Sequence, residues 1–297
     1  MEITCPKLGG SCDECPWAGI PGQVRDVMDC GLLECQECKL VTHSRSLANH
    51  VNYVEGSMHN WSGGHGDNLP KPSDDKLRRL NLLNKLIEQN NFSHPTILDF
   101  GCGNGEMLEI FQKYYETCGL EPDKEARELA KSRLDSRGWV FSDIDEAINS
   151  GTKFELITLF HVIEHFYDPD TELRNIGKVL KPGGLVVIET PNSQDALLTK
   201  YENSRFRTFT YWSHHPMLHS HKSLEIMMER NGYSVIENLG IQRYGLANHL
   251  YWLSEGRPGG HTIWDGFIGK NTDSHYETDL VAQEMNDTLW MVARIKD

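Results

Sequence analysis

Ile97-Leu-Asp-Phe-Gly-Cys-Gly-Asn-Gly105 is the stretch that decides the fold of this chain. Two apolar residues and Asp99 predict the end of a buried strand, and a helix opens directly after the loop. Gly101, Gly103 and Gly105 alternate in that loop, where glycine permits a positive φ and lets a ligand approach the backbone. Because the helix amino terminus adds unpaired N–H groups, the stretch predicts a cofactor cradle.

Strand and helix patterns alternate around this loop. The expected strands are 96–100, 117–120, 139–142, 154–160, 185–189, 233–239 and 288–294, and the expected helices are 74–87, 106–115, 123–134, 169–180 and 221–231. A turn is expected at 181–184 and a long active-site loop at 192–220. The βαβαβ order predicts an α/β fold with a parallel sheet, helices on both faces, and ligands beyond the carboxyl ends of the strands.

Composition and charge indicate which partners the protein can bind and where in the cell it works. The net charge of −14 disfavours nucleic acid as a partner, because binding phosphates needs clustered Lys and Arg. No apolar run approaches membrane-spanning length, and the first residues lack the basic and apolar parts of a signal peptide. We therefore expect a cytoplasmic protein without a membrane span.

An acidic residue identifies the kind of cofactor. Glu121 follows Asp99 by 22 residues, at the end of the second expected strand. A carboxylate there can accept two hydrogen bonds from ribose hydroxyls. The loop spacing is G-x-G-x-G, whereas a dinucleotide fold would need G-x-G-x-x-G. Because no pyrophosphate has to be seated, the loop can lie against an uncharged or zwitterionic chain.

Five ordered motifs resemble those of class I S-adenosylmethionine-dependent methyltransferases over roughly residues 75–240. They are Asp99–Gly105, Glu121, Ser142–Ile144, Phe160–His165 and Leu180–Gly184. The resemblance implies a Rossmann-like, doubly wound α/β fold with a mostly parallel seven-stranded sheet, whose antiparallel last strand is 288–294. It implies a methyltransferase domain at 61–297, with an acceptor-binding insertion around 192–220 and a carboxy-terminal extension at 241–285.

The same resemblance implies S-adenosylmethionine as the cofactor and assigns residues to its parts. The methionine part would border the three loop glycines, with Asp99 close by. Glu121 would hold the ribose and Asp143 would face the adenine amino group. Phe160 and His161, at the end of the fourth strand, would line the pocket near the methyl group.

Cysteines in the first 60 residues predict a small zinc-ribbon-like domain. Two Cys-x-x-Cys pairs stand there: Cys12, Cys15, Cys35 and Cys38. Four converging thiolates suit tetrahedral Zn²⁺, and a closed site of this kind is structural because it leaves no position for water. Cys5 or Cys30 could replace one of the four ligands. Disulfides or buried free thiols are the alternative.

A zinc ribbon before such a core resembles deoxysugar C-methyltransferases and related enzymes of surface-polysaccharide or antibiotic-sugar assembly. Their long carboxy-terminal domain has no counterpart here, which leaves O- or N-methylation open. We therefore expect methyl transfer to an oxygen or nitrogen of a small, nucleotide-activated sugar or glycan precursor. The alternatives are a C-methyltransferase of a deoxysugar, an O-methyltransferase of a small aromatic or quinone-like metabolite, and a ribbon that binds nucleic acid.

A His-rich stretch at 211–224 predicts the acceptor side of the site. Transfer to a hydroxyl needs a base, and histidine has a suitable pKa. In the resemblance His215 falls where relatives carry a His of a Glu-His pair, and His214 replaces the Glu. We take His215 as base or acceptor-positioning residue, with His214 and His165 as further candidates; simple packing is the alternative. Arg205 and Arg207 could bind phosphates or belong to a solvated loop.

Overall fold

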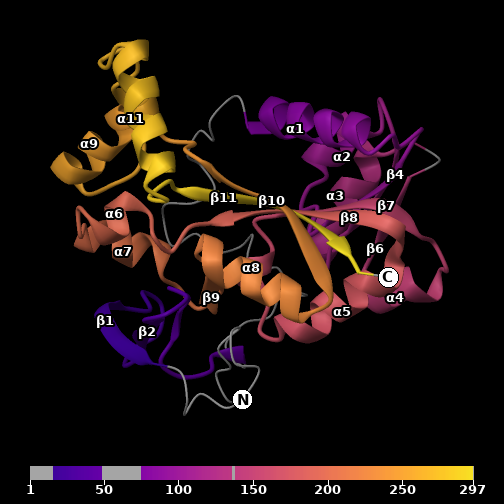
Figure 1. Ribbon diagram of the computed structural model, residues 1–297, viewed down its shortest axis with the longest axis horizontal. Coiled ribbons are helices and arrows are strands. Elements are labelled where there is room, and N and C mark those ends of the chain that lie inside the picture. The colour runs from indigo at the N-terminus through magenta and orange to yellow at the C-terminus, as the bar shows by residue number, and fades with distance from the viewer. Residues whose placement is uncertain (1–15, 49–74, 136–137, 297) are drawn as a thin grey trace.

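A seven-stranded sheet with the order β10-β11-β8-β7-β4-β5-β6 forms the centre of the molecule in a computed structural model, which describes residues 16–48, 75–135 and 138–296 (Figure 1). Its strands are β4 (Thr96–Phe100), β5 (Glu116–Leu120), β6 (Trp139–Phe141), β7 (Phe154–Phe160), β8 (Leu180–Pro191), β10 (Tyr233–Ile241) and β11 (Thr288–Ile295). Strands β4 to β8 are parallel, and β11 runs antiparallel to β8 and β10. The predicted mostly parallel sheet and its antiparallel last strand are confirmed.

Helices cover both faces of this sheet. One face carries α1 (Asp75–Gln89), α2 (Glu106–Phe111) and α3 (Lys124–Arg133), and the other carries α4 (Ile144–Asn149), α5 (Pro169–Val179) and α8 (His221–Arg230). Local sequence sets where α5 starts, because the Asp168 side chain accepts a hydrogen bond from Thr171 N (3.2 Å) and Pro169 has the φ of a first helical residue. Two apolar cores therefore sandwich the strands.

The structure differs from two local predictions. The start expected for the strand at 185–189 is wrong, because β8 already begins at Leu180. The turn expected at 181–184 is present as a bulge inside β8, since Leu180 pairs with Phe154, Leu185 pairs with Leu156, and Gly183 has a φ of +73°. The single loop expected at 192–220 is also wrong. It contains α6 (Ala196–Thr199), α7 (Ser204–Thr210) and β9 (Met217–Leu218). Rings of α7 pack on Trp252, so tertiary contacts order a segment whose own pattern is weak.

The extension at 241–285 forms three helices beside the ends of β10 and β11. They are α9 (Leu246–Glu255), α10 (Gly260–Ile263) and α11 (Lys270–Ala282), and Figure 1 shows α9 and α11 together at the upper left. Among the described residues, no helix has both the length and the apolar character needed to cross a membrane.

A second sheet joins the N-terminal part to the insertion. Strands β1 (Trp17–Gln23), β2 (Gly31–Cys35) and β3 (Val41–His43) are antiparallel, and β9 extends them by pairing with β3. Figure 1 shows β1 and β2, in indigo, below α6 and α7. The boundary expected near residue 60 lies outside the described residues. Among those described, the N-terminal strands and the insertion share one sheet rather than forming separate units.

Candidate active site

The glycine loop connects β4 to α2 with three residues in left-handed backbone. The φ values are +69° at Gly101, +52° at Gly103 and +78° at Gly105. A Cβ on Gly101 would lie 2.6 Å from Val162 Cγ2, and one on Gly105 would lie 2.8 Å from Ala130 Cα. A Cβ on Gly103 would meet nothing within 4 Å. Gly101 and Gly105 are therefore required by packing as well as by φ, whereas Gly103 borders open space.

Two acids lie beside the loop at the ends of neighbouring strands. Glu121 follows β5, and its carboxylate accepts hydrogen bonds from Gly103 N (2.8 Å) and Asp123 N (2.9 Å). Asp99 in β4 is buried and accepts a hydrogen bond from Thr158 Oγ1 (2.6 Å). Burial raises the pKa of Asp99 to about 6, against the opposing effect of that hydrogen bond. The structure thus brings Glu121 and Asp99 to the loop, as the motif order suggested.

Asp143 is placed farther along the same edge, before α4. Its Oδ1 accepts a hydrogen bond from Glu146 N (2.8 Å), and its Oδ2 accepts one from Ser142 Oγ (2.9 Å). The side chain is exposed. Asp143 is therefore the N-cap of α4, a role that the sequence analysis did not give it.

Phe160 is the last residue of β7 and His161 follows it, across β4 from Glu121. The Arg79 guanidinium lies 4.6 Å from the centroid of the Phe160 ring, and the His161 backbone has a φ of +58°. His161 Nε2 accepts a hydrogen bond from Arg243 Nη1 (3.0 Å), since a guanidinium only donates. Its Nδ1 lies 3.3 Å from Glu164 Oε1.

A buried ionic group that sequence reasoning missed surrounds this strand end. Glu189, at 0% exposure, accepts hydrogen bonds from Arg78 Nη1 (2.9 Å) and from Arg79 Nε (3.0 Å). Arg78 also reaches Asp75, which pairs with Arg243. The available signal was Glu189 itself, because an acid at the end of the apolar run 185–188 has to find a cationic partner when it is buried.

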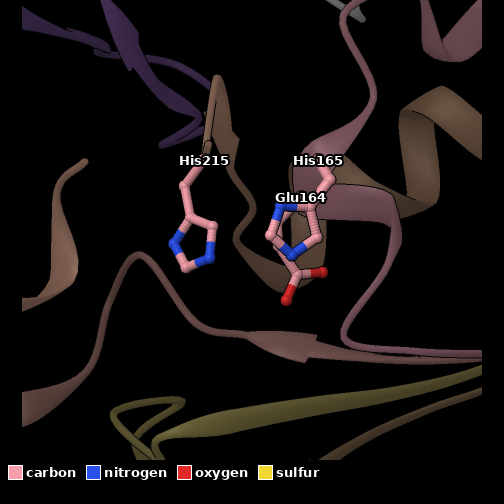
Figure 2. Close-up of side chains that lie close together, drawn as sticks. All are labelled: Glu164, His165 and His215. Carbon is pink, nitrogen blue, oxygen red and sulfur yellow. The ribbon is translucent and has the colours of Figure 1, made fainter. Parts of the chain in front are cut away.

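A histidine cluster lies just beyond the end of β7. It contains Glu164 and His165 from the short 3-10 helix η3 (Ile163–His165) and His215 from the loop after α7. Figure 2 shows the two imidazoles facing each other, with the Glu164 carboxylate beside the His165 ring. The ring centroids of His165 and His215 are 4.8 Å apart. Of the predicted catalytic residues, His165 and His215 are therefore brought together.

Hydrogen bonds fix the cluster's orientation. His165 Nδ1 must donate to the His214 carbonyl oxygen (2.6 Å), which puts the ring lone pair on Nε2. Glu164 Oε2 accepts from Thr190 Oγ1 (2.9 Å). The His214 ring instead packs 4.4 Å from the Trp212 ring. His214 thus contributes its backbone to the cluster.

Burial sets the charge of these groups. It lowers the pKa of His165, and burial next to His165 lowers the pKa of His215 well below its ordinary value. Burial acts to raise the pKa of Glu164, but contact with His161 outweighs it and lowers that pKa to about 2. At neutral pH the cluster holds one carboxylate and neutral imidazoles, which can accept a proton or bind an electrophile.

The N-terminal part holds the loop that carries His215. The Asp26 carboxylate accepts hydrogen bonds from Ser213 N (2.9 Å) and Ser213 Oγ (2.6 Å). His43 Nε2 donates to the Trp212 carbonyl oxygen (3.1 Å). The position of His215 therefore depends on residues more than 150 positions earlier in the chain.

Half of the predicted zinc ligands are described. Cys35 and Cys38 are fully buried beside Leu40, and Cys38 N donates to Cys35 Sγ at 3.5 Å. Cys30 belongs to a different apolar cluster, with its thiol 4.0 Å from Ser44 Oγ. Cys12 and Cys15, like the alternative ligand Cys5, lie outside the described residues.

Comparison with known proteins places the site in a family. The family model of the methyltransferase domain matches residues 74–238. The chain is 28% identical over 127 residues to a ubiquinone biosynthesis O-methyltransferase of Coxiella burnetii, covering 39% of this chain and 54% of that protein. It is 26% identical over 151 residues to the enzyme of that name from Vibrio cholerae, covering 48% and 60%. The chain thus spans little more than half the length of these curated relatives.

Comparison with solved structures returns matches of low sequence identity, with TM-scores below 0.5. The plantazolicin methyltransferase BamL, crystallised with a triazolic desmethylPZN analogue and S-adenosylhomocysteine, matches at 14% identity with a TM-score of 0.49, covering 76% of this chain and 87% of BamL. The N-methyltransferase NodS of Bradyrhizobium japonicum, in complex with S-adenosylhomocysteine, matches at 15% identity with a TM-score of 0.46, covering 78% and 90%.

Proposed function

Because the chain belongs to the methyltransferase-domain family over residues 74–238, we propose that it transfers the methyl group of S-adenosylmethionine to an oxygen or nitrogen of a small activated sugar or glycan precursor. The observation that carries the proposal is the pairing of two features at one edge of the sheet. One is a glycine loop open at Gly103 next to Glu121, and the other is the Glu164, His165 and His215 cluster beyond β7.

The residues at the glycine loop fit the cofactor. The space beside Gly103 takes the methionine part, with Asp99, Gly101 and Gly105 supporting the loop around it. Glu121 exchanges its hydrogen bond from Gly103 N for the ribose hydroxyls, which offer the same kind of donor.

The rest of the cofactor extends along the strand ends on either side. We assign Asp143 to the adenine end. We assign Phe160 and His161 to the methyl end, since both close β7 next to the histidine cluster. When bound, the cofactor supplies an electrophilic methyl group on a positively charged sulfur.

The histidine cluster fits the acceptor. In the transfer, an acceptor lone pair forms the bond to the methyl carbon as the carbon–sulfur bond breaks, and a hydroxyl acceptor gives up its proton. His215 acts as base or acceptor-positioning residue, with His165 beside it, while His214 orients His165 through its carbonyl oxygen. Positioning and proton transfer are the two contributions that a methyl transfer of this kind needs from the protein.

The acceptor class is proposed from the insertion and from the curated relatives. Arg205 lines an open cleft of about 350 Å³ between α7 and α9, where it could pair with a phosphate of a nucleotide-activated sugar beside the two acids Glu202 and Glu255. Arg207 is engaged inside the insertion, where Nη2 donates to the Leu198 carbonyl oxygen (2.8 Å). A second candidate, O-methylation of a small aromatic or quinone-like metabolite, is favoured by the names of the curated relatives. C-methylation of a deoxysugar is the third.

We also propose that the N-terminal part is a zinc ribbon which braces the acceptor loop. Two adjacent buried thiols, with a backbone N–H directed at one sulfur, suit a thiolate pair on Zn²⁺. Cys12 and Cys15 would complete the set. The metal would be structural, because it would stabilise the N-terminal strands, whose neighbouring residue Asp26 binds Ser213 in the loop.

The test combines binding and turnover. Calorimetry with S-adenosylhomocysteine should show tight binding to the wild-type protein. A screen of nucleotide sugars and of catechol-like acceptors should then identify which class is methylated. His215→Ala should lower turnover about a hundredfold or more, the size expected for a lost acid–base group, at unchanged cofactor affinity. His275→Ala, an exposed histidine on α11, should change neither; absence of cofactor binding by the wild type would refute the function.

A further inference from the structure

Glu164, His165 and His215 have the composition and arrangement of a metal site rather than of a packed histidine pair alone. Each offers one ligand atom, and these three atoms lie within 4.8 Å of one another. Figure 2 shows that the ligands come from two separate segments and converge on one point. Within the described part of the chain, no other three His, Cys, Asp or Glu side chains bring their ligand atoms this close together.

Two buried polar atoms of this group have no hydrogen-bond partner among the described residues, which supports a cation as their partner. Glu164 is 1% exposed, yet within the described part of the chain its Oε1 accepts no hydrogen bond. His161 Nδ1 lies 3.3 Å from Oε1, without the geometry of a hydrogen bond. His215 Nδ1 is buried and likewise without a hydrogen-bond partner among the described residues. A buried carboxylate oxygen is costly to leave unsatisfied, so a cation in contact with Oε1 would remove that cost.

The surroundings of the three ligands are those that a metal needs. His165 donates Nδ1–H to the His214 carbonyl oxygen, which directs its Nε2 lone pair to a metal, and Thr190 Oγ1 holds the second oxygen of Glu164. Such outer contacts fix the tautomer and orientation of ligands. With metal–ligand bonds of about 2.1 Å, ligand atoms stand roughly 3 to 3.5 Å apart, so a pair separated by the full 4.8 Å has to close by roughly 1.5 Å. His215 is carried by a loop, where a side-chain rotation supplies that movement.

We propose that Glu164, His165 and His215 bind one divalent transition-metal ion, which coordinates the hydroxyl of the methyl acceptor. Two imidazoles and one carboxylate with open positions favour ions such as Zn²⁺, Fe²⁺, Co²⁺ or Mn²⁺ over Mg²⁺ and Ca²⁺, which prefer oxygen ligands. The role in catalysis rests on the proposed function, but the site itself does not. A bound ion would lower the pKa of the acceptor hydroxyl, whose proton would pass to water; the oxyanion would then form the bond to the methyl carbon as the carbon–sulfur bond breaks, with neutral S-adenosylhomocysteine as the leaving group.

Cobalt binding tests the site without any turnover. The full-length protein, with its cysteine sites already loaded with Zn²⁺, is treated with a mild chelator and titrated with Co²⁺. The wild type should bind one Co²⁺ with weak visible d–d bands and no thiolate charge-transfer band, because no cysteine is a ligand. Glu164→Gln and His215→Ala should each weaken this binding at least tenfold. His275→Ala, far from the three ligands on the exposed side of α11, should leave these bands unchanged.

Each outcome bears on one proposal. A wild-type protein that takes up no Co²⁺ with these bands, or a Glu164→Gln variant that binds it as well as the wild type, overturns the metal site. Should Glu164→Gln fail to fold, His215→Ala decides, since its loop position makes folding less sensitive. S-adenosylhomocysteine binding is measured on the same samples, and its loss in the wild type would refute the methyltransferase function and not the metal site. Metal-free protein should bind that ligand normally but turn over at least tenfold more slowly until Co²⁺ or Zn²⁺ is added.

Discussion

The different surroundings of Gly103 and Gly105 predict that an alanine at Gly105 mainly lowers stability, whereas an alanine at Gly103 mainly lowers cofactor affinity. Alanine in left-handed backbone costs about 1–2 kcal/mol, and both positions carry that strain. At Gly105 the new methyl group would also lie 2.8 Å from Ala130 Cα. Because this neighbour is backbone and cannot rotate away, overpacking adds about 1–3 kcal/mol. We therefore expect Gly105→Ala to lose about 2–5 kcal/mol of unfolding free energy and Gly103→Ala about 1–2 kcal/mol.

Cofactor affinity should follow the reverse order. The methyl group of Gly103→Ala projects into the open space where the cofactor's methionine part is proposed to lie. A loss of at least tenfold in affinity for S-adenosylhomocysteine, or about 1.4 kcal/mol, is expected. Gly105→Ala points away from that space, so its folded fraction should bind nearly as the wild type does.

Urea denaturation and calorimetry measure the two effects separately. Gly151→Ala is the matched control, because Gly151 has a φ of +72°, a methyl group there would meet nothing within 4 Å, and the residue follows α4 away from the loop. It should lose about 1–2 kcal/mol of stability and no cofactor affinity. Equal stabilities for the two loop variants would refute the packing argument, and unchanged affinity of Gly103→Ala would refute the cradle.

Three further predictions concern the surroundings of the site. Glu189→Gln should lower the unfolding free energy by about 3 kcal/mol, the low end for breaking a buried ion pair, because two arginines lose their carboxylate; a shift under about 1 kcal/mol in urea denaturation would contradict this. Cys35→Ser should release the zinc of the wild-type protein, about one per chain by metal analysis, and Cys38→Ser should do the same; zinc-free, folded wild type would rule out the ribbon. Asp26→Ala should reduce turnover, because the exposed Asp26 positions the loop through its two hydrogen bonds to Ser213. The affinity for S-adenosylhomocysteine and the urea midpoint should stay nearly unchanged. Turnover equal to that of the wild type would show that the loop keeps its position without Asp26.

Local sequence was sufficient to predict the glycine loop and the acid beside it. The strand ending at Phe100, the alternating glycines and the acid at 121 follow one another within about 30 residues, and each has a local physical signature. Their arrangement in space then follows from the parallel sheet, which brings the carboxyl ends of neighbouring strands together.

The acceptor side could not be derived in the same way. Glu164 and His215 are about fifty residues apart, and their approach depends on contacts between η3 and the loop after α7. The ionic group joins residues 75–79 to Glu189 and Arg243 across the sheet. Helix α11 was missed because it buries Leu280 and little else, so it lacks the apolar stripe by which an amphipathic helix is recognised.

The pairing of β9 with β3 bears on how this protein can acquire a new substrate. Strand β9 belongs to the insertion of the catalytic domain, yet it completes a sheet begun by residues 17–43. The two segments therefore form one module that is discontinuous along the chain. Recombination that exchanged only the N-terminal segment would leave β9 beside an unmatched edge. Exchange of the insertion alone would leave β3 without its matched partner strand. Changes of acceptor specificity are thus expected to be inherited as linked substitutions in both segments, and a chimera intended to switch specificity has to carry both.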